Sequence, residues 1–275
     1  MRLTLLALTA AVTAVLCGGC ATQMGTRQSV AQDLDRILRG DQRSEADRAR
    51  DVYRHPKETL LFFGLRPNMR VVEIWPEAGW YTEVIAPLLA EHGKYYAAQQ
   101  PSDPRSSFIA TMLERYRAKL AARPDLYRTV EITSFSCTSG ESAPAGSADM
   151  VVTFRNVHNW MAQDCAPAAF AAMYRALKPG GVLGVVEHRG SRGQPQDPHA
   201  RSGYVSEEYA IGLIEAAGFK LVARAEINAN PRDTKDYEQG VWTLPPTYRL
   251  GERDHDKYAA IGESDRFTLK FVKPK

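Results

Sequence analysis

The sequence predicts an α/β protein in which a mostly parallel sheet is covered by helices on both faces. Short β-branched runs bounded by turn residues alternate with longer segments whose apolar residues keep helical spacing. The chain has 275 residues, and 256 remain without residues 1–19, a length that one α/β domain fills. Neither an internal repeat nor a low-complexity tract divides it. Residues 30–275 are therefore expected to form a single domain.

The first residues have the pattern of a bacterial export signal. Arg2 precedes a largely apolar stretch, residues 3–16, and small residues follow it. The stretch has 14 residues, fewer than the roughly 20 that a membrane-spanning helix needs. Residues 1–19 are predicted to be a signal peptide, and the small and polar residues 20–29 a tether between the membrane and the fold.

The end of this signal resembles a bacterial lipobox, in which Gly18 and Gly19 precede Cys20. The resemblance implies a lipoprotein with a lipid on Cys20, and Ala21 after it implies sorting to the outer membrane. The lipobox usually has Leu where this chain has Cys17, so ordinary signal cleavage near Ala21 stays open. Both alternatives place the mature chain outside the cytoplasm, in the periplasm.

Composition narrows the classes of partner. Lys and Arg number 35 against 32 Asp and Glu, and no basic tract is interleaved with aromatic residues, so nucleic acid is not an expected partner. The sequence has no Cys/His cluster with metal-ligand spacing, so no metal site is expected. Cys137 and Cys165 either form a disulfide, which an oxidising compartment permits, or remain two thiols. The oligomeric state is left open.

The predicted elements follow in chain order. A charged segment with Leu34, Ile37 and Leu38 at helical spacing predicts a helical cap over residues 30–61. Short runs of β-branched and apolar residues between turn residues then predict strands. These strands span residues 69–75, 94–99, 129–135, 149–154, 182–187, 221–227 and 266–272.

Helices are predicted between most of these strands. Val84, Ile85 and Leu88 mark one after the first strand, and residues 108–120 form another with Phe108, Met112 and Tyr116 on one face. A third carries Phe170 and Met173 and is ended by "KPGG". Ser206 is a plausible N-cap for a fourth helix, which Gly218 closes.

Ligands of open parallel sheets bind beyond the carboxyl ends of the strands, where the strand order reverses. The polar peptides at those ends are "EIWPEAGW", "AAQQP", "RNVHNW" and "EHRG". The residues that carry chemistry are expected in these four segments.

"VVEIWPEAGWYTEVIAP", "ADMVVTFRNVHNW" and "ALKPGGVLGVVEH", in this order, resemble a class I S-adenosylmethionine-dependent methyltransferase over roughly residues 56–275. More narrowly, "RNVHNW", "NPRDT" and "SDRFTLKFVKP" resemble a group of secreted bacterial predicted methyltransferases. The resemblance implies a Rossmann-like methyltransferase fold with a mostly parallel, seven-stranded sheet, and S-adenosylmethionine as cofactor.

In the family, the first strand ends in acid-x-Gly-x-Gly-x-Gly, which lets the backbone approach the cofactor. Here the acid is Glu73 and the last glycine Gly79, but Trp75 and Glu77 occupy the other two glycine positions. If the Glu77 carboxylate lies about 4 Å from the carboxylate of the cofactor, repulsion between the two charges costs about 4 kcal/mol of binding free energy at an effective dielectric of about 20. Alternatively, the Glu77 side chain faces solvent, or it stabilises the start of the following helix. At the end of the second strand, Gln99 replaces the usual acid. The cofactor-binding residues implied are Glu73, Trp75, Glu77, Gly79, Trp80, Gln99 and Arg155.

"RNVHNW" is the expected reacting centre. His158 is a candidate general base because its reference pKa lies near neutrality, and Asn156 is a candidate for positioning the nucleophile. Turn capping by these polar residues is the alternative. Glu187 and His188 end the fifth strand as a second acid and base. The residues expected to line the substrate pocket are Tyr81, Asn159, His188, His199, Tyr204, Asn230 and Asp233.

The sequence thus favours methyl transfer from S-adenosylmethionine to a small-molecule acceptor, in a lipoprotein anchored by Cys20 to the outer membrane. A catalytically inactive, methyltransferase-like binding protein of the cell envelope remains the alternative, because Trp75, Glu77 and Gln99 depart from the family pattern and fold alone does not establish function.

Overall fold

The computed structural model describes residues 18–101, 106–138 and 141–275, with side chains from residue 28 onward. Within these ranges one seven-stranded sheet has the strand order β3-β2-β1-β4-β5-β7-β6. The strands from β1 to β5 pair in parallel, whereas β7 runs antiparallel to both of its neighbours. This confirms the predicted mostly parallel, seven-stranded sheet. The strands are β1 (Arg70–Ile74), β2 (Lys94–Gln99), β3 (Val130–Ser134), β4 (Ala148–Phe154), β5 (Leu177–His188), β6 (Lys220–Ala225) and β7 (Arg266–Val272).

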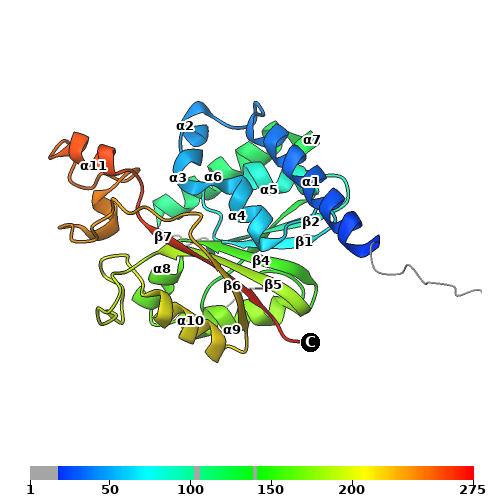
Figure 1. Ribbon diagram of the computed structural model, residues 1–275. Helices are drawn as coiled ribbons and strands as arrows, with labels where there is room; N and C mark the ends of the chain where they lie inside the picture. The colour runs from blue at the N-terminus through cyan, green and yellow to red at the C-terminus, as the bar shows by residue number, and fades with distance from the viewer. Residues whose placement is uncertain (1–17, 102–105, 139–140) are drawn as a thin grey trace, which may run out of the picture.

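Helices cover both faces of the sheet (Figure 1). On one face lie α1 (Gly18–Leu38), α4 (Pro56–Phe63), α5 (Thr82–Leu89), α6 (Ser107–Ala122) and α7 (Pro124–Tyr127). On the other lie α8 (Val157–Ala162), α9 (Ala166–Ala176) and α10 (Glu207–Ala216). Each face has its own apolar core, because β1 and β4 are buried on both sides and send alternate side chains to each.

The N-terminal cap consists of α1, the short helices α2 (Glu45–Arg48) and α3 (Asp51–Arg54), and α4. Val30, Leu34 and Ile37 of α1 are buried, as their helical spacing predicts. Residues 20–29, which we expected to be a tether, instead belong to α1. Packing of these three buried side chains against the domain stabilises the first turns of the helix. Further turns then add to an existing helix at little cost in free energy.

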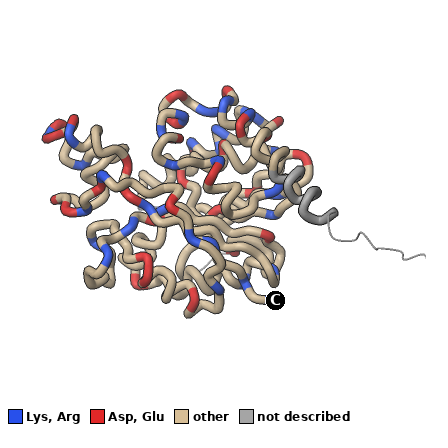
Figure 2. The backbone as a smooth tube through the Cα atoms, in the orientation of Figure 1, with Lys and Arg blue, Asp and Glu red and all other residues tan. Residues whose placement is uncertain are grey.

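Residues 1–17 of the predicted leader lie outside the described part of the chain, and the side chain of Cys20 is not described. Among the described helices, none is both long and apolar enough to cross a membrane. Basic and acidic residues are interspersed along the chain, in keeping with its nearly balanced charge (Figure 2).

One helical expectation differs from the structure. In α6, Met112, Leu113 and Tyr116 are buried, but Phe108 is 74% exposed because contact with the core begins one turn later. The helix α9 ends at Ala176, before "KPGG" as predicted, and β5 already begins at Leu177. Gly181 is required there, because a Cβ atom would lie 2.9 Å from the Lys178 carbonyl oxygen.

A long segment between β6 and β7 lies at the carboxyl edge of the sheet and contains the 3₁₀ helix η1 (Gly240–Thr243) and α11 (His255–Ile261). The carboxylate of Asp233 holds it in place. This carboxylate accepts hydrogen bonds from Tyr204 Oη at 2.8 Å and from the Asp265 amide at 2.7 Å. The segment forms a wall of the site described below.

Cys137 and Cys165 form a disulfide, with their Cα atoms 5.6 Å apart. The bond joins the loop after β3 to the N-cap of α9. The sequence left open whether these cysteines form a disulfide or remain two thiols, and the structure has the disulfide.

Candidate functional site

The turn between β1 and α5 has a left-handed backbone at three alternate residues. The φ angles are +52° at Trp75, +51° at Glu77 and +85° at Gly79. These are the three positions where the family pattern has glycine. The chain keeps the backbone path of such a turn with only one glycine in it. For residues that carry a Cβ atom, this conformation costs about 1–2 kcal/mol each.

Packing of the Trp75 ring offsets this cost. The side chain is 7% exposed, and its Nε1 donates a hydrogen bond of 2.9 Å to the Phe135 carbonyl oxygen. The ring also makes edge contacts with Phe135 and Trp160, at centroid distances of 6.2 and 5.7 Å. Burial of an indole contributes several kcal/mol, which exceeds the strain at this residue.

Glu77 and Gly79 have different reasons for their places in the turn. The Glu77 side chain is exposed and faces the open part of the site. Gly79 is required by packing, because a Cβ atom would lie 2.8 Å from the Tyr116 ring. Of these three positions, only position 79 requires glycine for two reasons, its positive φ angle and the lack of room for a Cβ atom.

Glu73, the acid at the end of β1, is buried. Burial raises its pKa to about 8, although a hydrogen bond from Tyr95 Oη partly opposes the shift. Tyr95 Oη also lies 3.0 Å from Thr82 Oγ1, which in turn lies 3.0 Å from Tyr116 Oη. A hydrogen-bonded chain therefore connects the acid of β1 with α5 and α6, and the carboxyl group is neutral at pH 7.

Gln99 ends β2 beside this turn. Its Nε2 donates a hydrogen bond of 3.1 Å to the Glu77 carbonyl oxygen. Its Oε1 is buried and has no hydrogen-bond partner in the described part of the chain. An orphaned acceptor at the end of β2 suits a hydroxyl donor, such as those of a ribose.

A cavity of about 140 Å³, the turn cavity, lies between this turn and the N-terminal cap. Of the seven residues predicted to bind cofactor, five line it: Glu73, Trp75, Glu77, Trp80 and Arg155. Tyr81, predicted for the substrate pocket, lines it too and stacks on Phe154. Gly79 and Gln99 belong to the turn and to its support and do not line the cavity.

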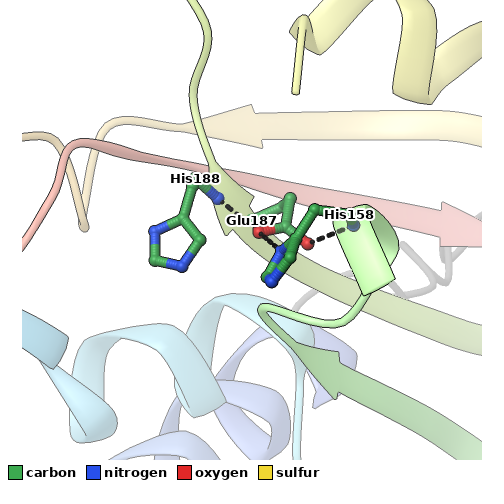
Figure 3. A group of neighbouring side chains, drawn as sticks. All are labelled: His158, Glu187 and His188. Atoms are coloured by element: carbon green, nitrogen blue, oxygen red, sulfur yellow. Dashed lines mark hydrogen bonds and ion pairs between the residues drawn. The ribbon is translucent and has the colours of Figure 1, made fainter. Parts of the chain in front are cut away.

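His158 and Glu187 form a buried pair at the ends of β4 and β5 (Figure 3). The Glu187 side chain is fully buried, and its Oε1 lies 3.0 Å from His158 Nδ1. Its oxygens also accept from the amides of His158 and His188, at 3.2 and 2.7 Å. Because a carboxylate only accepts, His158 Nδ1 carries the proton and Nε2 is left as a free acceptor.

His188 lies beside this pair, with its ring centroid 5.3 Å from that of His158. Its Nδ1 lies 2.5 Å from Ser264 Oγ. Burial, and then the neighbouring charges of His158 and two arginines, hold the pKa of His188 well below its usual range. His158, Glu187 and His188 could together ligate a metal ion, but hydrogen bonds already satisfy Glu187 and both Nδ1 atoms.

A second cavity of about 320 Å³, the histidine cavity, is lined by His158, Asn159 and His188. Sequence reasoning missed the other residues of its wall, among which those with polar or aromatic side chains and a role below are Arg50, Arg54, Trp242, Ser264 and Arg266. The sequence features that could have indicated these residues are Arg50 and Arg54, four residues apart in the cap, and Arg266 at the start of an apolar strand. The two cavities meet, since four residues line both: Arg50, Arg54, Glu77 and Arg155.

The structure places the remaining predicted residues away from both cavities. The Asn156 amide donates to the Ile74 carbonyl oxygen at 2.9 Å and to Thr153 Oγ1 at 3.1 Å, so it braces β1 against β4. His199 is exposed and pairs with Asp164. Asn230 donates to the Glu263 carbonyl oxygen at 2.7 Å, and Tyr204 and Asp233 bond each other. Asn230 and Asp233 hold residues 263 and 265, which flank Ser264 in the wall of the histidine cavity.

Comparison with known proteins gives one family match and a set of solved structures with this fold. Residues 85–185 match the family model described as a methyltransferase domain, a span that includes His158 but not the turn at residues 75–79. No curated protein sequence matches the chain.

Solved structures with the same fold include a SAM-dependent methyltransferase from Aquifex aeolicus, 16% identical, with a TM-score of 0.55 over 88% of this chain and 98% of that one. The [4+2]-cyclase SpnF is 18% identical, with a TM-score of 0.55 over 90% and 97%. Phosphoethanolamine N-methyltransferase 2 from Haemonchus contortus, in complex with S-adenosyl-L-methionine, is 17% identical, with a TM-score of 0.55 over 81% and 53%. At this identity, the likeness establishes the fold.

Proposed function

We propose that this chain, which has the fold of class I S-adenosylmethionine-dependent methyltransferases, transfers a methyl group from that cofactor to a small-molecule acceptor. The observation that carries the proposal is the His158–Glu187 pair at the edge of the histidine cavity. A buried carboxylate that fixes one ring nitrogen of a histidine leaves the other as an oriented base. Such a pair is the machinery that proton abstraction from an acceptor requires.

The residues around the turn fit the cofactor. The backbone of the turn is left-handed at residues 75, 77 and 79, the glycine positions of the family pattern, and Gln99 beside it has a buried acceptor, Oε1, without a described partner. Arg50, which lines the turn cavity, suits the carboxylate of the cofactor. When bound, S-adenosylmethionine would supply an electrophilic methyl group on a sulfonium centre, and the carbon–sulfur bond would break with its electron pair kept by the sulfur of S-adenosylhomocysteine.

His158 then removes the proton that an acceptor hydroxyl or amine loses as its oxygen or nitrogen bonds to the methyl carbon. Glu187 stabilises the imidazolium that results, because its carboxylate already holds Nδ1. Trp242 packs on the His158 ring at a centroid distance of 6.0 Å, so part of the ring is shielded from water. The proton leaves through Nε2 once the methylated product departs.

The test uses S-adenosylmethionine with a radioactive methyl group and a small-molecule extract of bacterial cells. We expect the wild-type protein to label an extract component, and His158→Gln to label it about 100-fold more slowly or worse. The control is His199→Gln, which changes an exposed histidine outside both cavities and should label normally. If His158→Gln labels the extract as fast as the wild type does, His158 is not the general base.

A second candidate is a binding protein that keeps the fold without catalysis. It is favoured by Gln99, whose amide is tied to the turn, and by the Trp75 ring, which is packed between Phe135 and Trp160. This candidate predicts binding of a ligand in the histidine cavity without any transfer of label.

We also propose that the chain is an envelope lipoprotein, with a lipid on Cys20 and an outer-membrane location. The disulfide between Cys137 and Cys165 supports export, because such bonds persist in oxidising compartments. Mass spectrometry of the mature N-terminus tests the anchor. A diacylglyceryl group on Cys20 is expected. A free N-terminus near Ala21 would instead show ordinary signal cleavage and no lipid anchor.

A further inference from the structure

The histidine cavity is basic. Four arginines line it, from three parts of the chain: Arg50 and Arg54 in the cap, Arg155 after β4, and Arg266 at the start of β7. Glu77 is the one acidic residue among those that line it. Segments far apart in sequence therefore bring guanidinium groups to the cavity that holds His158.

One carboxylate partly neutralises three of these groups. Glu263 lies 2.7 Å from Arg50 Nε and 3.0 Å from Arg54 Nε, and it also pairs with Arg266. Burial raises the pKa of Glu263, but the charges of Arg266 and Arg50 outweigh it, so the pKa lies below its ordinary value. Even when Glu187 behind His158 is counted, the arginines outnumber the acids that face them.

Donors of this cluster remain open. Arg54 is 4% exposed, yet its Nη2 has no hydrogen-bond partner within the described ranges, and the same holds for Nε of the buried Arg266. A buried donor without a partner is costly, and guanidinium donors match the oxygens of carboxylate and phosphate.

Arg155 adds a charge that no described carboxylate pairs with, since all the ion pairs of the described residues involve other side chains. Its backbone is left-handed, with a φ of +63°, a strain that is typical of functional sites. Its charge contributes, after burial, to lowering the pKa values of Arg266 and His188. The cationic groups of the cavity thus repel one another in the absence of an anion.

On the basis of the proposed function, we infer that the methyl acceptor is an anion, whose phosphate or carboxylate group binds Arg54, Arg155 and Arg266 beside His158. Such an anion satisfies the open donors and relieves the repulsion among the arginines. The cluster thereby selects charged acceptors over neutral ones, because a neutral molecule would leave the buried guanidinium donors unpaired.

Binding of simple anions tests this inference without any need for turnover. Thermal unfolding is followed in increasing inorganic phosphate and, separately, succinate, with and without saturating S-adenosylhomocysteine. Arg155→Gln is compared with wild type and with Arg128→Gln, which removes an equal charge outside both cavities. Arg54→Gln is a second cavity variant if Arg155→Gln fails to fold.

We expect saturable stabilisation of wild type and Arg128→Gln, with about tenfold weaker anion binding in Arg155→Gln or Arg54→Gln. Tighter binding of phosphate assigns a phosphate ester as acceptor, and tighter binding of succinate assigns a carboxylate. Equal anion responses in all variants would overturn the inference. So would loss of anion binding in S-adenosylhomocysteine, because the arginines would then hold the cofactor carboxylate. Anion binding that depends on Arg155 in a protein without affinity for S-adenosylhomocysteine would support the anion site and overturn the proposed methyl transfer.

Discussion

Gln99 Nε2 donates a hydrogen bond of 3.1 Å to the Glu77 carbonyl oxygen and so ties the end of β2 to the left-handed turn after β1. The bond holds the turn in its path although Trp75 and Glu77 replace two glycines. Because the bond uses the Glu77 backbone and the side chain is exposed, the glutamate side chain itself contributes little to the turn.

Glu77→Gly is therefore expected to stabilise the protein by about 1 kcal/mol, because glycine adopts a positive φ without strain. Affinity for S-adenosylmethionine should rise or stay unchanged. Trp75→Gly relieves the same strain but empties a buried aromatic site, and it should destabilise by about 3–5 kcal/mol. Urea unfolding measures both. A clear loss of cofactor affinity in Glu77→Gly would show that its carboxylate belongs to the site.

Glu73 should make stability depend on pH. Its pKa is about 8 in the folded protein against 4.5 for an ordinary glutamate, so between these values the folded state holds a proton that the unfolded state releases. The free energy of unfolding should fall as pH rises through this window, by up to about 5 kcal/mol, and then level off above pH 8. Glu73→Gln should lack this fall. Parallel stability curves for the two proteins from pH 5 to 9 would exclude a buried neutral Glu73.

Glu187 should act through His158. Glu187→Gln keeps the shape of the side chain but removes the charge that stabilises the imidazolium, so methyl transfer should slow about 100-fold. In the double variant with His158→Gln, the loss should be close to that of His158→Gln alone, because the two residues act as one unit. Rates of S-adenosylhomocysteine formation measure this. Additive losses would mean that Glu187 acts by another route.

The disulfide should contribute about 3–4 kcal/mol, because it closes a loop with a sequence separation of 28 residues. Replacing Cys137 and Cys165 together by serine should lower the midpoint of urea unfolding. Reductant should lower the midpoint of the wild type but leave the double variant unchanged. A wild type insensitive to reductant would mean that the bond is dispensable for stability.

The sheet could be predicted closely from the sequence. The bounds of β2 and β7 match the predicted residues 94–99 and 266–272, because buried strands have a dense apolar pattern between turn residues. The N-cap of α10 was predicted correctly from Ser206, which accepts from the Tyr209 amide. Local patterns of this kind need no tertiary information. The tether and Phe108 differed because docking, which is not local, decides where a helix starts and which of its turns is covered.

The site could be predicted only in part. His158 follows β4 and Glu187 lies near the end of β5, and the carboxyl ends of these neighbouring strands meet, so the topology alone brings the two residues together. Arg50, Arg54 and Arg266 could not be placed, because the cap and the first residue of β7 meet through tertiary contacts, with Glu263 and with the Tyr53 carbonyl oxygen. Asn156 has the position of a catalytic residue, but its amide completes hydrogen bonds between β1 and β4.

The most direct test of the account is a calorimetric titration of the purified protein with S-adenosylmethionine and then with S-adenosylhomocysteine. The account predicts micromolar binding of both, at one site per chain, with the turn of Trp75 and Glu77 serving as a cofactor turn. Absence of binding at millimolar cofactor would contradict it. The chain would then be a binding protein that keeps the methyltransferase fold without its reaction.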